Sequence, residues 1–128
     1  MNVSEKNEEV FSLVLNEIAK SVIRLLNKSE HQPSDRIILG ENDDQSIFVM
    51  GRILVGICDH ESERKIVSDV STILVASAMP LGESRIKAIV AEVRAKCTNQ
   101  VLALQRAHTD IENGSSAEET LADIRELL

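Results

Sequence analysis

The residues from 83 to 112 contain the pattern that most restricts the fold of this 128-residue chain. Side chains that suit a buried helix face recur at every seventh position in two interleaved series, and neither proline nor glycine interrupts them. A sustained heptad repeat is typical of helices that pack nearly parallel or antiparallel along their length. The two series are Ile86, Val93, Gln100 and Ala107, and Val90, Cys97, Leu104 and Ile111. The pattern predicts one long helix over 83–112 and an all-α fold.

Two more helices are predicted before this segment. The first begins at Ser4, which can cap the first turn, and runs to about Lys28 with apolar residues three and four positions apart. The second covers about 44–79 and starts as an almost wholly apolar stretch, which indicates a central helix. Its polar run at 59–65 leaves two interpretations open, a continuous helix or one that is kinked near Asp59. Pro80 and Gly82 are expected to end it.

Two acidic segments complete the predicted organisation. Residues 29–43 are predicted to form an acidic connecting loop, and residues 113–128 an acidic tail with a short amphipathic helix. Gly114 marks the end of the preceding helix, and Ser116 with Glu119 forms a capping box for the tail helix. We expect a single helical domain over 1–128, an elongated bundle of three or four long helices plus a short C-terminal helix. Whether the tail docks on its own chain or on another is left open.

Charge and composition exclude several classes of function. The net charge is −7, which disfavours a general electrostatic grip on nucleic acid or on an anionic membrane. The aromatic fraction is 2%, with no Trp or Tyr, which argues against base-stacking modules and aromatic-rich β folds. The apolar stretches contain charged residues and are shorter than the roughly 20 residues of a membrane span. We therefore expect no membrane-spanning helix.

The cysteines and the N-terminus point to a reducing compartment. Cys58 and Cys97 each lie in apolar, helical sequence, which suits small buried side chains better than a disulfide framework. The first residues are mostly polar and include several glutamates, whereas a signal peptide begins with positively charged residues, so a cytoplasmic location is expected. Arg94 and Lys96 beside Cys97 keep open a second interpretation of this residue as a reactive thiol.

Motifs that carry catalysis or cofactors are missing from the sequence. The five glycines are scattered and match neither a dinucleotide-binding nor a phosphate-binding loop. The acidic and sulfur-containing run from Cys58 to Glu63 is the nearest approach to a metal site, but adjacent helical residues point in different directions. We therefore expect no enzymatic activity, no cofactor and no bound metal.

The remaining hypothesis is an interaction protein. Long helices in a short chain leave apolar flanks that a second copy or another protein can cover. We expect an adaptor, inhibitor, immunity protein or chaperone that binds a protein partner and forms a homodimer. Gln100 on the heptad seam could fix the register of such a contact, although an ordinary place in the chain's own core is an equally good interpretation. The candidate partner-binding residues are Val93, Gln100, Leu104, Leu121, Ile124, Leu127 and Leu128.

The alternative hypothesis is a small dimeric regulator that binds nucleic acid. Its contact would be the basic face of the 83–112 helix, and a dimer would double that face. Acidic residues are interleaved with the basic ones, which also fits a solvated, salt-bridged surface. The candidate nucleic-acid contacts are Arg85, Lys87, Arg94, Lys96 and Arg106.

Overall fold

The computed structural model describes residues 3–28, 42–76 and 82–128, and every regular element among them is an α-helix. The all-α prediction is therefore confirmed for these residues. The expected connecting loop at 29–43 falls, up to residue 41, outside the described part, as does the expected helix end at Pro80. The six helices are α1 (Val3–Asn27), α2 (Asp44–Cys58), α3 (Glu63–Ala76), α4 (Glu83–Lys96), α5 (Thr98–Glu112) and α6 (Ala117–Arg125).

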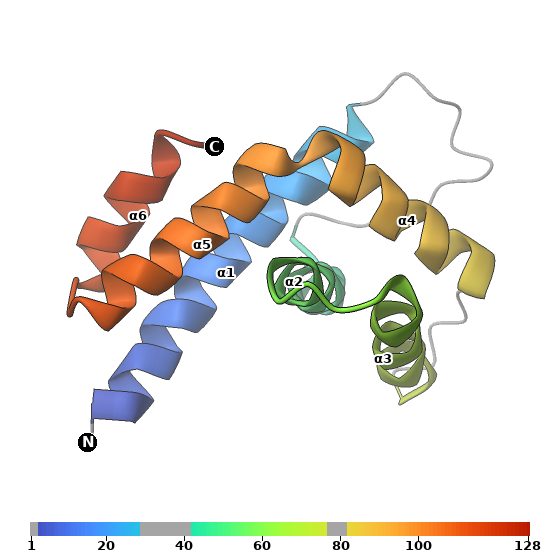
Figure 1. Ribbon diagram of the computed structural model, residues 1–128, viewed down its shortest axis with the longest axis horizontal. Helices are drawn as coiled ribbons and strands as arrows, with labels where there is room; N and C mark the ends of the chain where they lie inside the picture. Colours follow the sequence, from blue (N-terminus) through green and yellow to red (C-terminus); the bar gives the residue numbers. More distant parts are fainter. Residues whose placement is uncertain (1–2, 29–41, 77–81) are drawn as a thin grey trace.

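The helices are arranged around α2. Figure 1 shows α1 and α5 side by side, with α6 on the outer side of α5, and it shows α3 and α4 together at the other end of the molecule. Helix α2 contacts α1, α3, α4 and α5, so it joins the two groups. Eight of its residues, from Ser46 to Gly56, are buried, as expected for a helix that is apolar on most sides. The prediction of a central second helix is confirmed.

The predicted helix over 44–79 is broken near Asp59. Helix α2 ends in a Schellman motif, in which the amide of Glu61 donates to the Gly56 carbonyl oxygen (2.9 Å) and the amide of His60 donates to that of Ile57 (3.1 Å). His60 has a φ of 56°, a left-handed conformation that glycine usually supplies. Because a histidine takes that place, no glycine signalled the helix end. Of the two interpretations, the broken helix is therefore the one found.

The continuous helix predicted over 83–112 is wrong. Cys97 separates α4 from α5 with φ −112° and ψ 36°, outside the helical region, although its amide still donates to the Val93 carbonyl oxygen (2.9 Å). The described residues thus form one long helix, α1, four helices of 14 or 15 residues and the short α6, and not the three or four long helices that were expected. The expected elongation followed from a continuous helix over 83–112, which the break at Cys97 excludes. The heptad seam is nevertheless buried on both sides of the break, from Ile86 to Ile111.

Two glycines of α2 lie where neighbouring side chains come close. A β-carbon at Gly56 would lie 2.7 Å from Ile66 Cγ1 and 3.0 Å from Glu61 Oε2, so α3 packs directly on this position. At Gly51 it would lie 3.3 Å from Cδ2 of Leu15 on α1. At both glycines the neighbouring atoms belong to side chains and not to another helix's backbone.

The tail folds back on its own chain. Helix α6 packs on α5 and α1, with Thr120 and Ile124 buried. The predicted capping box is present, because the Glu119 amide donates to Ser116 Oγ at 3.2 Å. Gly114 has a φ of 84° and its amide donates to the Ile111 carbonyl oxygen, which ends α5 as predicted. The question that the sequence left open is answered for this chain: the tail docks in cis.

A pair of carboxyl groups joins α5 to α6. Arg106 on α5 donates to both carboxylate oxygens of Asp123 on α6, from Nε at 2.8 Å and Nη2 at 3.3 Å. Burial and a hydrogen bond to Asp123 raise the pKa of Asp110. Hydrogen bonds from Asp110 and Arg106 lower the pKa of Asp123. Protonated Asp110 therefore donates to the Asp123 carboxylate, and this hydrogen bond is lost when both acids are ionised.

We predict that Asp110→Asn stabilises the protein at neutral pH. A carboxyl whose folded pKa is raised contributes stability below its ordinary pKa, and that contribution is lost as the pH rises through the folded value. The amide keeps a donor toward Asp123 and removes the repulsion. Thermal melts should therefore show a higher Tm at pH 7 and less loss of stability on going from acid to neutral pH. The matched variant Asp123→Asn should lower the Tm, because it removes the ion pair with Arg106; equal effects of the two variants would contradict this account.

Candidate functional site

The predicted nucleic-acid face is divided between two helices. Arg85, Lys87, Arg94 and Lys96 lie on α4, whereas Arg106 lies on α5 beyond the break at Cys97. All five side chains are exposed, but two have structural partners. Arg94 Nη2 donates to the Glu61 carbonyl oxygen at 3.1 Å, and Arg106 pairs with Asp123. The structure therefore gives these residues no single continuous basic stripe.

Most of the predicted partner-binding residues lie in the chain's own core. Val93, Leu104 and Ile124 are completely buried, and Gln100 is 4% exposed. Gln100 Nε2 donates to Ser21 Oγ on α1 at 3.2 Å, so its polar group is matched within the chain. These four are not part of the surface of the folded monomer. The other three belong to the tail: Leu121, within α6, and Leu127, after it, are half-buried, and Leu128 is exposed.

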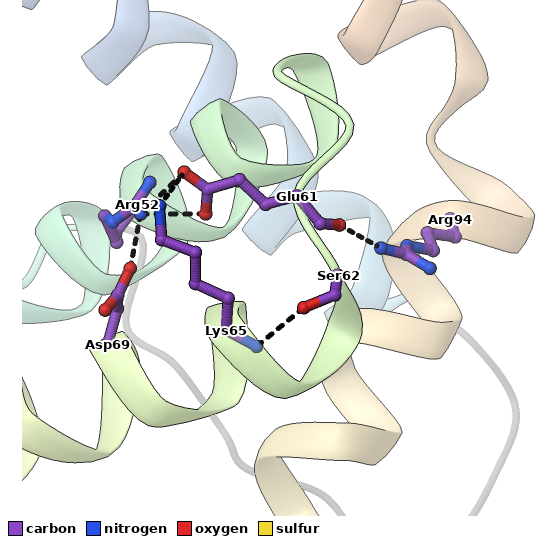
Figure 2. Close-up of polar contacts among 6 residues, drawn as sticks. All are labelled: Arg52, Glu61, Ser62, Lys65, Asp69 and Arg94. Atoms are coloured by element: carbon purple, nitrogen blue, oxygen red, sulfur yellow. Dashed lines mark hydrogen bonds and ion pairs between the residues drawn. The ribbon is translucent and has the colours of Figure 1, made fainter.

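A cluster of charged side chains holds the α2–α3 connection (Figure 2). Arg52 Nη2 on α2 donates to Glu61 Oε2 at 2.9 Å and to Asp69 Oδ2 on α3 at 2.5 Å. Lys65 Nζ donates to Glu61 Oε1 at 3.3 Å, and Arg94 reaches the Glu61 backbone from α4. The hydrogen bond from Arg52 lowers the pKa of the Glu61 carboxyl, with a smaller contribution from Lys65. Every charged group in the cluster has a partner, so its role is to hold three helices together around Glu61.

A groove with a volume of about 920 Å³ runs between α3 and α4. Residues Val67, Ser68, Ser71, Thr72 and Val75 supply much of its α3 side, and charged side chains lie toward its ends. The hydrogen bond from Arg94 on α4 to Glu61 before α3 places the end of one helix beside the start of the other. The two helices are therefore antiparallel. The charged residues that line the groove are Glu63, Arg64, Glu83 and Lys87.

Two side chains in this groove are in unusual environments: an apolar side chain is exposed, and a buried hydroxyl has no hydrogen bond. Val75 is 82% exposed, the most exposed of the large apolar side chains in the described residues. Ser71 Oγ is buried but has no hydrogen-bond partner, and it is the one such side-chain atom found among the described residues. A buried hydroxyl without a partner is unfavourable by about 1–3 kcal/mol. Val75 is thus the exposed apolar side chain in this groove.

The cysteines and the acidic run have no arrangement that supports catalysis. Burial raises the pKa of the Cys97 thiol to about 11, so this thiol is protonated at neutral pH and is not an activated nucleophile. Burial also raises the pKa of Cys58. Among the residues with described positions, no three His, Cys, Asp or Glu side chains come close enough together to hold a metal ion. In the same residues, none of the helices is both long and apolar enough to cross a bilayer.

No family model, no curated protein and no solved structure matches the chain.

Sequence reasoning missed the α3–α4 groove because it placed 44–79 in one helix and 83–112 in another, without placing them side by side. A signal was present, since Arg64, Ser68, Ser71 and Val75 recur at steps of three and four residues on one face of α3. That face is too polar to be recognised as a buried stripe. Lys87 was singled out, but as part of a basic face and not as one side of a groove.

Proposed function

We propose that this chain is a non-enzymatic protein–protein interaction module, and that the α3–α4 groove is its docking surface. An adaptor, an inhibitor, an immunity protein or a chaperone would each use such a surface. The observation that carries the proposal is the exposed Val75 side chain, which lies in a groove lined mostly by small polar and charged side chains. An apolar contact surrounded by polar groups is the usual composition of a protein-binding surface.

The charge of the groove also favours a protein over nucleic acid. Glu63 and Glu83 balance Arg64 and Lys87, so the four charged lining residues have no net charge. A phosphate backbone is bound by an excess of cations, which this groove does not offer. A protein surface of mixed charge can pair with both signs.

We predict that Val75→Asp abolishes binding of a protein partner without unfolding the chain. Because Val75 is 82% exposed, a carboxylate at this position stays hydrated in the free protein but is buried in a complex. The tagged chain is used to capture proteins from the lysate of its host, with and without nuclease, and captured proteins are identified by mass spectrometry. The control is Leu102→Asp, an equivalent change at an exposed leucine of α5, outside the groove.

The expected result is one protein that wild type and Leu102→Asp capture in near-stoichiometric amount and Val75→Asp does not. Capture that is unaffected by Val75→Asp would place the interaction elsewhere and overturn the groove proposal. Capture that disappears with nuclease would favour the nucleic-acid hypothesis instead. Circular dichroism of each variant checks that the helical content is unchanged.

A further inference from the structure

The four charged residues of the α3–α4 groove are distributed as two opposite pairs. Glu63 and Arg64 lie at the start of α3, and Glu83 and Lys87 lie in the first turns of α4. Since the two helices are antiparallel, these pairs lie toward opposite ends of the groove. Each end therefore carries one acid and one base.

This pattern is complementary to itself in one orientation. If two copies packed with their α3 helices parallel, each residue near the two-fold axis would face its own counterpart, acid against acid and base against base. With α3 antiparallel to its counterpart, the Glu63–Arg64 end of one copy meets the Glu83–Lys87 end of the other. Each acid can then face a base.

The net charge of the chain also favours the groove as the place where two copies meet. At a net charge of −7, two copies repel each other over most of their surfaces. The repulsion is smallest where a face carries balanced charges, as the groove does. A strongly basic partner, in contrast, would be drawn to the acidic parts of the surface.

The middle of the groove is suited to close contact between helices. Ser68, Ser71 and Thr72 present small side chains there, which allow a second helix to approach closely. A second copy would cover Val75, which is 82% exposed in the monomer. Because the dimer is symmetric, the same contact would cover Val75 of both copies.

We infer that the α3–α4 groove takes a second copy of this chain, giving a two-fold symmetric homodimer with antiparallel α3 helices. The inference rests on the proposed interaction function and names the partner. Arg64 of each copy faces Glu83 of the other, and Glu63 faces Lys87 in the same way. A contact confined to one groove is below the size of most stable complexes, so the dimer forms in the micromolar range.

The test uses two charge reversals, each of which weakens the homodimer and which together restore opposite charges in a heterodimer. Arg64→Glu makes one end of the groove acidic, and Glu83→Arg makes the opposite end basic. Each variant alone loses attraction at both ends of its homodimer, and its dissociation constant should rise about tenfold or more. An equimolar mixture of the two should form a heterodimer, because the acidic end of one then meets the basic end of the other. Sedimentation velocity from low to high micromolar concentration measures all three samples, and a size tag on one variant identifies the heterodimer.

The matched control is Arg85→Glu, the same reversal on an exposed side chain of α4 that does not line the groove. It should leave the dimer within about twofold of wild type. A wild-type protein that stays monomeric at high micromolar concentration would overturn the inference, and so would a mixture that dimerises no better than its two components. A loss caused equally by Arg85→Glu would also overturn it, since the effect would then follow net charge.

Failure of this inference is distinguishable from failure of the proposed function. If the chain is monomeric but captures a different protein in a Val75-dependent manner, the groove is a docking surface for another partner and only the homodimer is wrong. If Val75→Asp changes neither self-association nor capture of another protein, the proposed function itself is wrong.

Discussion

Replacing Leu104 with alanine is expected to destabilise the folded chain by about 2–5 kcal/mol, the largest effect that we predict. Leu104 is completely buried, on the heptad seam of α5 that faces the core. Removing its branched side chain loses the favourable transfer of that side chain out of water and leaves a cavity that neighbouring helices fill only in part. Denaturant unfolding followed by circular dichroism measures the change in the free energy of unfolding.

The control for this experiment is Leu102→Ala, on the same helix. Leu102 is 46% exposed, so its truncation should change stability by no more than about 0.5 kcal/mol. The comparison also tests the position of Leu104 in the assembly. In the chain's own core, the loss of stability is independent of protein concentration. A loss that becomes smaller as the concentration rises would show that Leu104 lies between two copies, as its heptad position had suggested.

The second large effect is expected for Arg52→Met, which keeps much of the length of the side chain but removes its charge. Arg52 is the one side chain that pairs with both Glu61 and Asp69 among the described residues. Without it, the Glu61 carboxylate, which is only 14% exposed, loses its main hydrogen-bond donor. We expect the Tm at neutral pH to fall by several degrees, because the connection between α2 and α3 is held through Glu61.

The pH dependence of this effect has a definite sign. The folded pKa of Glu61 is lowered, mainly by Arg52, so the pair contributes stability above the ordinary glutamate pKa and loses it as the pH falls through the lowered value. The difference in Tm between wild type and Arg52→Met should therefore be largest at neutral pH and shrink in acid. Lys65→Met is the control, since Lys65 is 60% exposed and makes the longer contact to Glu61, and its effect should be small. If the difference in Tm between wild type and Arg52→Met were the same at neutral and at acid pH, the assigned role of Arg52 would be contradicted.

The sequence predicted most of the buried helix faces correctly. The seam from Ile86 to Ile111 is inside, the second helix is central, and the capping box at Ser116 starts the last helix. These features are local, because helix caps and apolar periodicity depend on residues that are close together in the sequence. The helix ends at Asp59 and Cys97 were harder to predict. Neither has a glycine or proline at the break, so the contacts of the surrounding helices, including those of Glu61, favour conformations that the local sequence does not signal.

The candidate site was the part least accessible from sequence. Its residues come from two helices, and only their antiparallel packing places Glu83 and Lys87 across a groove from Ser71 and Val75. The tertiary structure likewise decided that Val93, Gln100, Leu104 and Ile124 are internal. A heptad seam requires a helix to pack against it but does not say whether that helix belongs to the same chain. The sequence by itself thus determined the all-helical class and which helix faces are apolar, whereas only the packing of the helices decided which faces are covered and where a groove remains.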